Sequence, residues 1–129
     1  MDFRSLLFVG LGSFVGGVLR FVSVFWIDRK EVGDFPLGVL LVNAFGSFAI
    51  GLALPLYERM GWGRDDAAPL LISVGLLGGF TTFSTFSLQT LRLLQSGHLG
   101  LAGLNALGSV VACLLSVYLG WKLGEFFWS

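Results

Sequence analysis

The stretch Gly75-Leu-Leu-Gly-Gly-Phe-Thr-Thr-Phe-Ser-Thr-Phe-Ser87 lies in the middle of an apolar segment that is long enough to cross a bilayer. Its residues suit a lipid-facing helix poorly, because Gly78 and Gly79 have low helix propensity and residues 81–87 hold five hydroxyls. An unpaired polar group in hydrocarbon is costly, so irregular backbone persists at membrane depth only where it is buried in protein or lines a watery path. The stretch therefore predicts a membrane-spanning helix that is broken near its centre and lies beside a pathway for a polar solute.

The whole sequence predicts an all-α membrane protein with four transmembrane helices, of which this segment is the third. Apolar residues make up 55% of the chain and charged residues 12%, with a mean hydropathy of +0.85, whereas a soluble domain has about 25% charged residues. Segments of ~20 mostly apolar residues cross a bilayer, and four are present, at Ser5–Ile27, Pro36–Leu56, Pro69–Leu91 and Leu99–Trp121. We expect one multi-pass membrane domain over residues 1–129, with the lipid bilayer around it.

The composition argues against several other classes of protein. The net charge is zero and the sequence has no basic patch, so nucleic acid is not expected as a partner. Cys113 is the only cysteine and lies inside the fourth span, which excludes an internal disulfide. His98 stands alone in a loop, where a solvated side chain is the simplest interpretation. Since the sequence contains no cluster of histidine, cysteine and carboxylate residues, we do not expect an enzyme.

The positive charges of the loops say little about orientation in the membrane. Four lie on the side that holds both termini and the second loop, and three lie on the other side; they are Arg4, Arg59, Arg64 and Lys122 against Arg29, Lys30 and Arg92. Because the positive-inside rule depends on a difference between the two sides, two interpretations stay open. Either the chain inserts both ways up, or a subtler cue fixes one orientation.

Arg20 is the only ionisable residue deep within the first span. It follows Gly12 and Gly16 at intervals of four residues, so the three share one helical face. The glycine pair is typical of close helix packing. An arginine inside an apolar span is by default a functional hypothesis. Two alternatives are open: its side chain extends to the membrane surface, or it attracts anions near the mouth of a pathway.

Polar stripes also run along the second and fourth spans. Asn43 shares a face with Ser47 and Gly51, and it either bonds another helix or offers amide donors to a permeating anion. The fourth span carries a stripe of small and polar residues at Asn105, Ser109, Ala112, Cys113, Ser116 and Gly120. No Asp or Glu lies within any span, whereas cation pathways and proton-coupled exporters depend on buried carboxylates. These features favour an anion or a neutral solute.

Two phenylalanines of the opening stretch are compatible with an anion. An aromatic ring carries positive potential at its edge, so the rings of Phe83 and Phe86 are able to face an anion edge-on. Their spacing of three residues by itself indicates ordinary helix packing. From spacing alone, the packing interpretation is preferred.

Three segments resemble the Fluc-type (CrcB-like) family of fluoride channels. The sequence GLLGGFTTFSTFS at residues 75–87 is similar to the family signature, GSFVGGVLR at Gly12–Arg20 is similar to its glycine-rich first span, and PLGVLLVNAFGSFAIG at Pro36–Gly51 carries the family asparagine. The resemblance extends over the whole chain in order and length, and the third-span motif is long and specific.

The resemblance implies an antiparallel, dual-topology homodimer with two fluoride pores and one central, structural sodium ion that is not transported. It assigns the sodium ligands to the backbone carbonyls of Gly78 and Thr81 in both subunits. It further implies pore-lining or anion-contacting roles for Phe83, Phe86, Asn43, Ser84, Thr85 and Ser109, with Arg20 near the mouth. Many members have a tyrosine and two hydroxyl residues along the fourth span, where this chain has Asn105, Ser109 and Cys113; a thiol is a weaker donor than a hydroxyl.

The expected function is a fluoride-selective passive channel that exports fluoride across the cell membrane, here a bacterial inner membrane, and prevents its toxic accumulation. One alternative is a small dual-topology coupled transporter of the multidrug type, which requires a membrane-embedded glutamate that this sequence lacks. Another is an assembly subunit with no conductance of its own. Fluoride efflux from liposomes that contain only this protein separates these possibilities.

Overall fold

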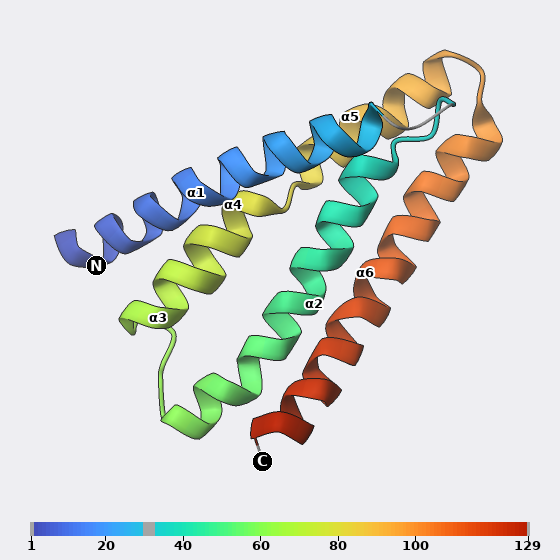
Figure 1. Cartoon of the computed structure of the whole chain (residues 1–129). Coiled ribbons are helices and arrows are strands. Elements are labelled where there is room, and N and C mark those ends of the chain that lie inside the picture. Colours follow the sequence, from blue (N-terminus) through green and yellow to red (C-terminus); the bar gives the residue numbers. More distant parts are fainter. Residues whose placement is uncertain (1, 30–32, 129) are drawn as a thin grey trace.

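The computed structural model describes residues 2–29 and 33–128, and all of its regular structure is helical (Figure 1). Within these residues, four helical spans are long and apolar enough to cross a membrane, which confirms the predicted four-span membrane fold. The elements are α1 (Phe3–Asp28), α2 (Leu37–Met60), α3 (Ala67–Pro69), the π-helical η1 (Leu70–Leu77), α4 (Gly78–Phe80), α5 (Phe83–Gln95) and α6 (Leu99–Trp128). The third span consists of α3, η1, α4 and α5. Lys30, one of the positive loop residues counted above, lies outside the described residues.

The first and third spans pack backbone against backbone. A side chain at Gly12 or Gly16 would collide with the main chain of η1 at Leu71 or Leu76. On the other side of the contact, a Cβ at Gly79 would lie 2.7 Å from the carbonyl oxygen of Ser13. The packing role predicted for the first-span glycines is therefore confirmed, and the third span contributes glycines of its own.

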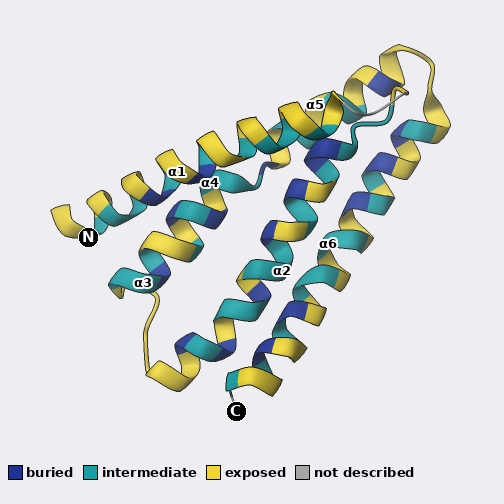
Figure 2. Ribbon diagram, in the orientation of Figure 1, coloured by how far each residue is buried: buried dark blue, intermediate teal, exposed yellow. Residues whose placement is uncertain are grey.

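The second and fourth spans form a similar glycine-lined pair and run side by side (Figure 1). A side chain at Gly51 would collide with the main chain of Val117, and one at Gly120 would collide with that of Phe48. A Cβ at Gly124 would lie 2.8 Å from the carbonyl oxygen of Leu52. Figure 2 shows buried positions spaced along α2 and α6 where the two helices meet.

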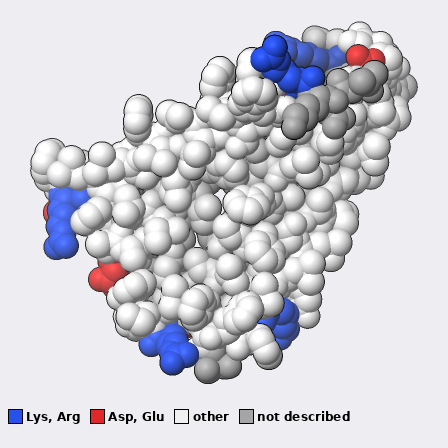
Figure 3. Space-filling view, in the orientation of Figure 1, with Lys and Arg blue, Asp and Glu red and all other residues white. Residues whose placement is uncertain are grey.

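The surface of the chain is that of a membrane protein. Large apolar side chains point outward along the spans; Phe14 is 72% exposed and Leu107 is 74% exposed. Figure 3 shows the charged side chains of this face gathered at the two ends of the molecule, with an uncharged band between them. An apolar band flanked by charged ends matches the hydrocarbon layer and the two polar surfaces of a bilayer. The protein is thus a multi-pass membrane protein.

Candidate functional site

The backbone of the third span leaves the helix at Thr81 and Thr82. Thr81 has φ −85° and ψ 159°, and Thr82 has φ −152° and ψ 122°, so both residues are extended between the end of α4 and the start of α5. Gly78 and Gly79 are helical, and the first extended residue is Thr81. Glycine is required at residue 79 because α1 approaches there, and the departure follows two residues later.

Asn43 of α2 holds the extended segment from the side. Its Nδ2 donates to the carbonyl oxygen of Thr82 at 2.9 Å, and its Oδ1 accepts from the amide of Thr82 at 2.7 Å. The carboxamide thus pairs with both main-chain groups of one residue, as a neighbouring strand would. Of the two alternatives for Asn43, the bond to another span is the one that the structure contains. One of its two N–H groups is not used by this pairing.

The hydroxyls after the extended segment gather at the N-terminus of α5. The Oγ1 of Thr82 accepts from the amide of Thr85 at 3.2 Å, which caps the helix. The hydroxyls of Ser84 and Thr85 each lie 3.2 Å from the same Thr82 oxygen. The first amides of α5, those of Phe83 and Ser84, have no acceptor within the helix. Together with the helix dipole, these donors favour negative charge at this position.

The extended segment also changes the hydrogen bonding of the two carbonyls that the family resemblance singles out. The Thr82 amide, which would donate to Gly78 in a continuous helix, donates to Asn43 instead. The Gly78 carbonyl therefore loses its usual helical donor. The Thr81 carbonyl accepts from Nη1 of Arg20 at 3.0 Å. Both oxygens belong to the main chain around the point where the helix is interrupted.

Arg20 contacts the interruption. Besides its bond to Thr81, its side chain lines a cavity of about 570 Å³ together with Asp28 and Arg29 at the end of α1 and with Thr82 and Thr85 at the start of α5. The cavity therefore links Arg20 both to the charged end of the first span and to the hydroxyl cluster. A role for Arg20 in anion passage stays a prediction.

A second cavity, of about 300 Å³, lies against the same extended segment. Its lining includes Asn43, Ser47, Gly78, Thr81, Thr82, Phe83 and Cys113. Thr82 lines both cavities, and so the paired Asn43 and Thr82 lie between two spaces that also contact Arg20 on one side and Phe83 on the other. The structure thus gathers most of the predicted site residues around Thr82.

Phe83 and Phe86 contact each other on α5. Their ring centroids are 5.2 Å apart, with the planes tilted by 46°. Phe83 is 76% exposed in the single chain, and Phe86 is partly buried. Ser84, between them, is also exposed. Contact between either ring edge and an anion stays a prediction.

Ser109 is buried on α6, and its printed hydrogen bond is to Asn105 one turn earlier on the same helix. It is 5% exposed, and its hydroxyl donates to Oδ1 of Asn105 at 3.4 Å. Asn105 is 1% exposed and donates through Nδ2 to the hydroxyl of Thr90 at 2.8 Å. Thr90 was not predicted as a site residue, although it follows Phe86 by four residues and therefore shares its helical face.

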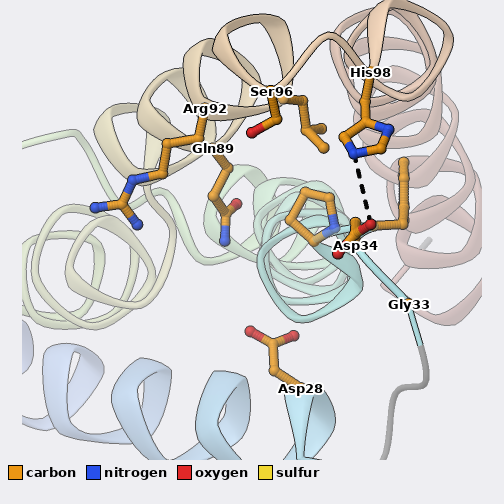
Figure 4. A pocket seen from close by; sticks show the side chains of 10 residues that line it. Asp28, Gly33, Asp34, Gln89, Arg92, Ser96 and His98 are labelled. Carbon is orange, nitrogen blue, oxygen red and sulfur yellow. Dashed lines mark ion pairs between the residues drawn. The ribbon is translucent and has the colours of Figure 1, made fainter.

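At the end of the molecule where the α1–α2 and α5–α6 connections meet, a pocket of about 360 Å³ is lined by polar side chains (Figure 4). His98 lies 3.7 Å from the carboxylate of Asp34 and is solvated, as the sequence interpretation held. Both are exposed, with 47% and 72% of the side chain accessible. Gln89 also lines the pocket, and its Oε1 is buried without a partner among the described residues. Sequence reasoning missed Gln89, which is next to Thr90 on α5.

The fold and the site define a class: a small helical membrane protein of four spans whose third span is interrupted by hydroxyl-bearing, extended residues. The chain belongs to the family described as "CrcB-like protein, Camphor Resistance (CrcB)", which matches residues 7–121. The family predicted from the three sequence segments is thereby confirmed.

Several relatives are similar over nearly their full length. The chain is 44% identical to "Fluoride-specific ion channel FluC" of Thermus thermophilus over 124 residues, which cover 96% of each chain. It is 46% identical to the protein of the same name from Magnetococcus marinus over 125 residues, 94% of this chain and 98% of that one. It is 41% identical to "Fluoride-specific ion channel FluC 1" of Methanosarcina acetivorans over 116 residues, 90% of this chain and 87% of that one.

Proposed function

We propose that this protein is a fluoride-selective channel that lets fluoride leave the cell passively, down its gradient, and so prevents its accumulation. The observation that carries the proposal is the extended Thr82, which Asn43 holds by two hydrogen bonds beside a cluster of hydroxyls and the N-terminus of α5. The relatives named as fluoride-specific ion channels support the choice of ion. As a channel rather than an enzyme, the protein carries the ion without a reaction.

In this mechanism, hydrogen-bond donors of the protein replace the water around fluoride. Candidate donors are the N–H of Asn43 that Thr82 does not use, the hydroxyls of Ser84 and Thr85, and the first amides of α5. The edges of Phe83 and Phe86 add positive potential without a competing hydrogen bond. Ser109 contributes a donor only if its hydroxyl proton leaves Asn105, to which it donates within α6.

The electrostatics of the site favour an anion and do not provide for coupling. Arg20 and the N-terminal end of α5 both place positive charge near Thr82. A coupled exporter of similar size would use a carboxylate inside the membrane. The predicted spans of this chain contain no Asp or Glu. Passive conduction is therefore the favoured mechanism.

The working unit in this proposal is an antiparallel homodimer with two pores in the cell membrane, which is the inner membrane of a bacterial host. The nearly balanced loop charges support insertion in both orientations. Adding two or three lysines to the side that bears both termini would force one orientation. Activity should then be lost and return on coexpression with an oppositely biased variant; full activity from one orientation would reject the antiparallel dimer.

A structural sodium ion is part of the proposal, held by the carbonyls of Gly78 and Thr81 in both subunits. The donor chemistry fits, because carbonyl oxygens suit a hard cation, the Gly78 carbonyl has lost its helical donor and Gly78 is exposed in the single chain. The Thr81 carbonyl keeps one lone pair beside its bond to Arg20. When bound, the ion would supply positive charge to the Gly78 oxygen, which lacks its helical donor, and to the second lone pair of the Thr81 oxygen.

The sodium ion has its own test. Exhaustive replacement of sodium by a large organic cation should lower both dimer stability and fluoride flux. Thr81→Ser should be tolerated because a main-chain oxygen is the ligand, whereas Gly78→Leu should remove the response to sodium. Unchanged stability and flux after sodium removal would reject the ion.

The proposed function is tested with purified protein in liposomes. Vesicles loaded with potassium fluoride are opened to potassium by valinomycin, and external fluoride is followed with an electrode. Rapid fluoride release, with chloride-loaded vesicles as the comparison, is the expected result. Protein-containing vesicles that release fluoride no faster than empty ones would refute the channel and would favour the assembly-subunit alternative.

A further inference from the structure

The main-chain carbonyls of the two phenylalanines of α5 each accept a hydrogen bond from a hydroxyl four residues later in the same helix. The hydroxyl of Ser87 donates to the carbonyl oxygen of Phe83 at 2.9 Å, and the hydroxyl of Thr90 donates to that of Phe86 at 2.9 Å. Such a bond joins the side chain to a carbonyl of its own helix and tends to bend the helix. In these bonds to their own helix, Ser87 and Thr90 are equivalent.

Thr90 differs from Ser87 because its hydroxyl also accepts a hydrogen bond from another helix. Its Oγ1 accepts from Nδ2 of Asn105 on α6 at 2.8 Å, whereas Ser87 is exposed. Asn105 is 1% exposed, and its Oδ1 accepts in turn from the hydroxyl of Ser109 at 3.4 Å. A chain of three donations therefore runs from Ser109 through Asn105 and Thr90 to the carbonyl of Phe86.

The direction of the chain matters for its strength. Asn105 and Thr90 each accept from the member before and donate to the next, so the bonds polarise one another in the same sense. Because Asn105 occupies one lone pair of Thr90, the Thr90 proton is directed toward Phe86 and not toward another acceptor. An amide buried to this degree is costly to leave unpaired, which holds α5 and α6 in one register.

We propose that Asn105 and Thr90 are positioning residues for anion passage, which fix α5 against α6 and thereby set the orientation of the Phe86 ring. They act through the helix and do not contact the ion. The expected effect on fluoride flux rests on the proposed function, since Phe86 is a proposed pore residue. It deepens that function by assigning the fourth-span asparagine to the support of the pore rather than to its lining.

The flux experiment uses variants that break the chain at one link. Thr90→Val keeps the shape and removes both the donor and the acceptor, and Asn105→Leu removes the carboxamide. Each should lower the maximal fluoride flux in liposomes by roughly tenfold, the effect expected when a buried hydrogen bond no longer holds the productive geometry. Thr90→Ser, which keeps the hydroxyl, should restore flux. The double variant should be no worse than the worse single one, because both act on one link.

Ser87→Ala is the matched control, since it removes the equivalent bond to Phe83 without touching α6. It should change flux by less than about twofold. The concentration of fluoride that gives half-maximal flux should stay unchanged in all variants, because the ion is not a direct partner. The inference is overturned if Thr90→Val conducts like the wild type, if the two single effects multiply in the double variant, or if Ser87→Ala is equally impaired.

A second readout is independent of conduction. 4-Fluorophenylalanine placed at residue 86 reports the ring environment by fluorine NMR in detergent. Thr90→Val and Asn105→Leu should both shift or broaden its signal, Thr90→Ser should return it, and Ser87→Ala should leave it unchanged. An unchanged signal in the first two variants overturns the inference. If wild-type vesicles fail to release fluoride while these NMR changes occur, the positioning of Phe86 stands and the proposed function fails by itself.

Discussion

The two halves of the third span are held in place by different physical means. The first half, η1 and α4, meets α1 through glycines, so main chain lies against main chain. The second half, α5, is tied to its neighbours by side-chain hydrogen bonds, from Asn43 at its start and from Asn105 near its middle. Glycine contacts tolerate no added atoms, whereas a polar tie depends on a few specific groups. The first half is therefore a scaffold and the second a site.

The largest expected effect comes from filling a glycine contact in the scaffold half. Gly16→Val would push against the main chain of Leu76 and Phe80, which cannot move aside without separating the spans. We expect a loss of at least about 3 kcal/mol of stability and little monodisperse protein. Thermal unfolding followed by size-exclusion chromatography in detergent measures this.

Gly10→Val is the matched control on the same helix, because no atom beyond its own helical turn lies within 4 Å of the position that a Cβ would take at Gly10. It should purify like the wild type. Equal behaviour of the two variants would mean that the glycine face of α1 is not what holds the scaffold half.

The next effect in size concerns the start of the site half. Asn43→Ala leaves the amide and the carbonyl of Thr82 without their partner, at a cost of roughly 2–5 kcal/mol for two buried groups. Fluoride flux should fall even at saturating fluoride, because the extended segment loses its support and a donor is lost. Ser47→Ala, on the same face of α2 and in the same cavity, is the control. Comparable losses in both variants would argue against a special role of the Asn43 pairing.

The sequence was sufficient for the fold because its signals are local. Apolar length marks each of the four spans, and the spacing of Gly12 and Gly16 marks a close helix contact. The point of departure from the helix was harder to locate. Gly78 and Gly79 have low helix propensity, yet both are helical, and at Gly79 the close approach of Ser13 requires glycine.

The partners of the polar residues were not predictable, because they join spans that are distant in sequence. Asn43 and Thr82 are 39 residues apart, and Arg20 and Thr81 are 61 apart. A stripe of polar residues on one helix shows that some partner exists without saying which. For the same reason the sequence placed Asn105 in a polar stripe without naming Thr90 as its partner.

Substitution of Phe83 and Phe86 tests whether aromatic rings, as well as hydrogen bonds, contribute to fluoride flux through the site half. Phe83→Ile and Phe86→Ile approximately keep the apolar volume and remove the ring quadrupole, so the protein should stay folded. Flux should fall by about tenfold, a loss near the upper limit for one aromatic contact. Normal flux in both variants would return the pair, whose ring centroids are 5.2 Å apart, to a packing role.

The smallest effect is expected at Arg20, which contacts both halves because it bonds the Thr81 carbonyl between them. Its charge raises the local concentration of anions in the adjoining cavity, and salt screens that attraction over roughly 10 Å at 0.1 M. Arg20→Ala should therefore reduce flux by about threefold at low fluoride and low salt, and less at high salt. Arg20→Lys keeps the charge but not the planar fork of donors, so it separates attraction from the bond to Thr81. Flux like the wild type in Arg20→Lys would assign the effect to charge alone. If Arg20→Lys instead conducts like Arg20→Ala, with no dependence on salt, the effect is assigned to the hydrogen bond between Arg20 and the Thr81 carbonyl. The extended segment would then depend on Arg20 as much as it depends on Asn43.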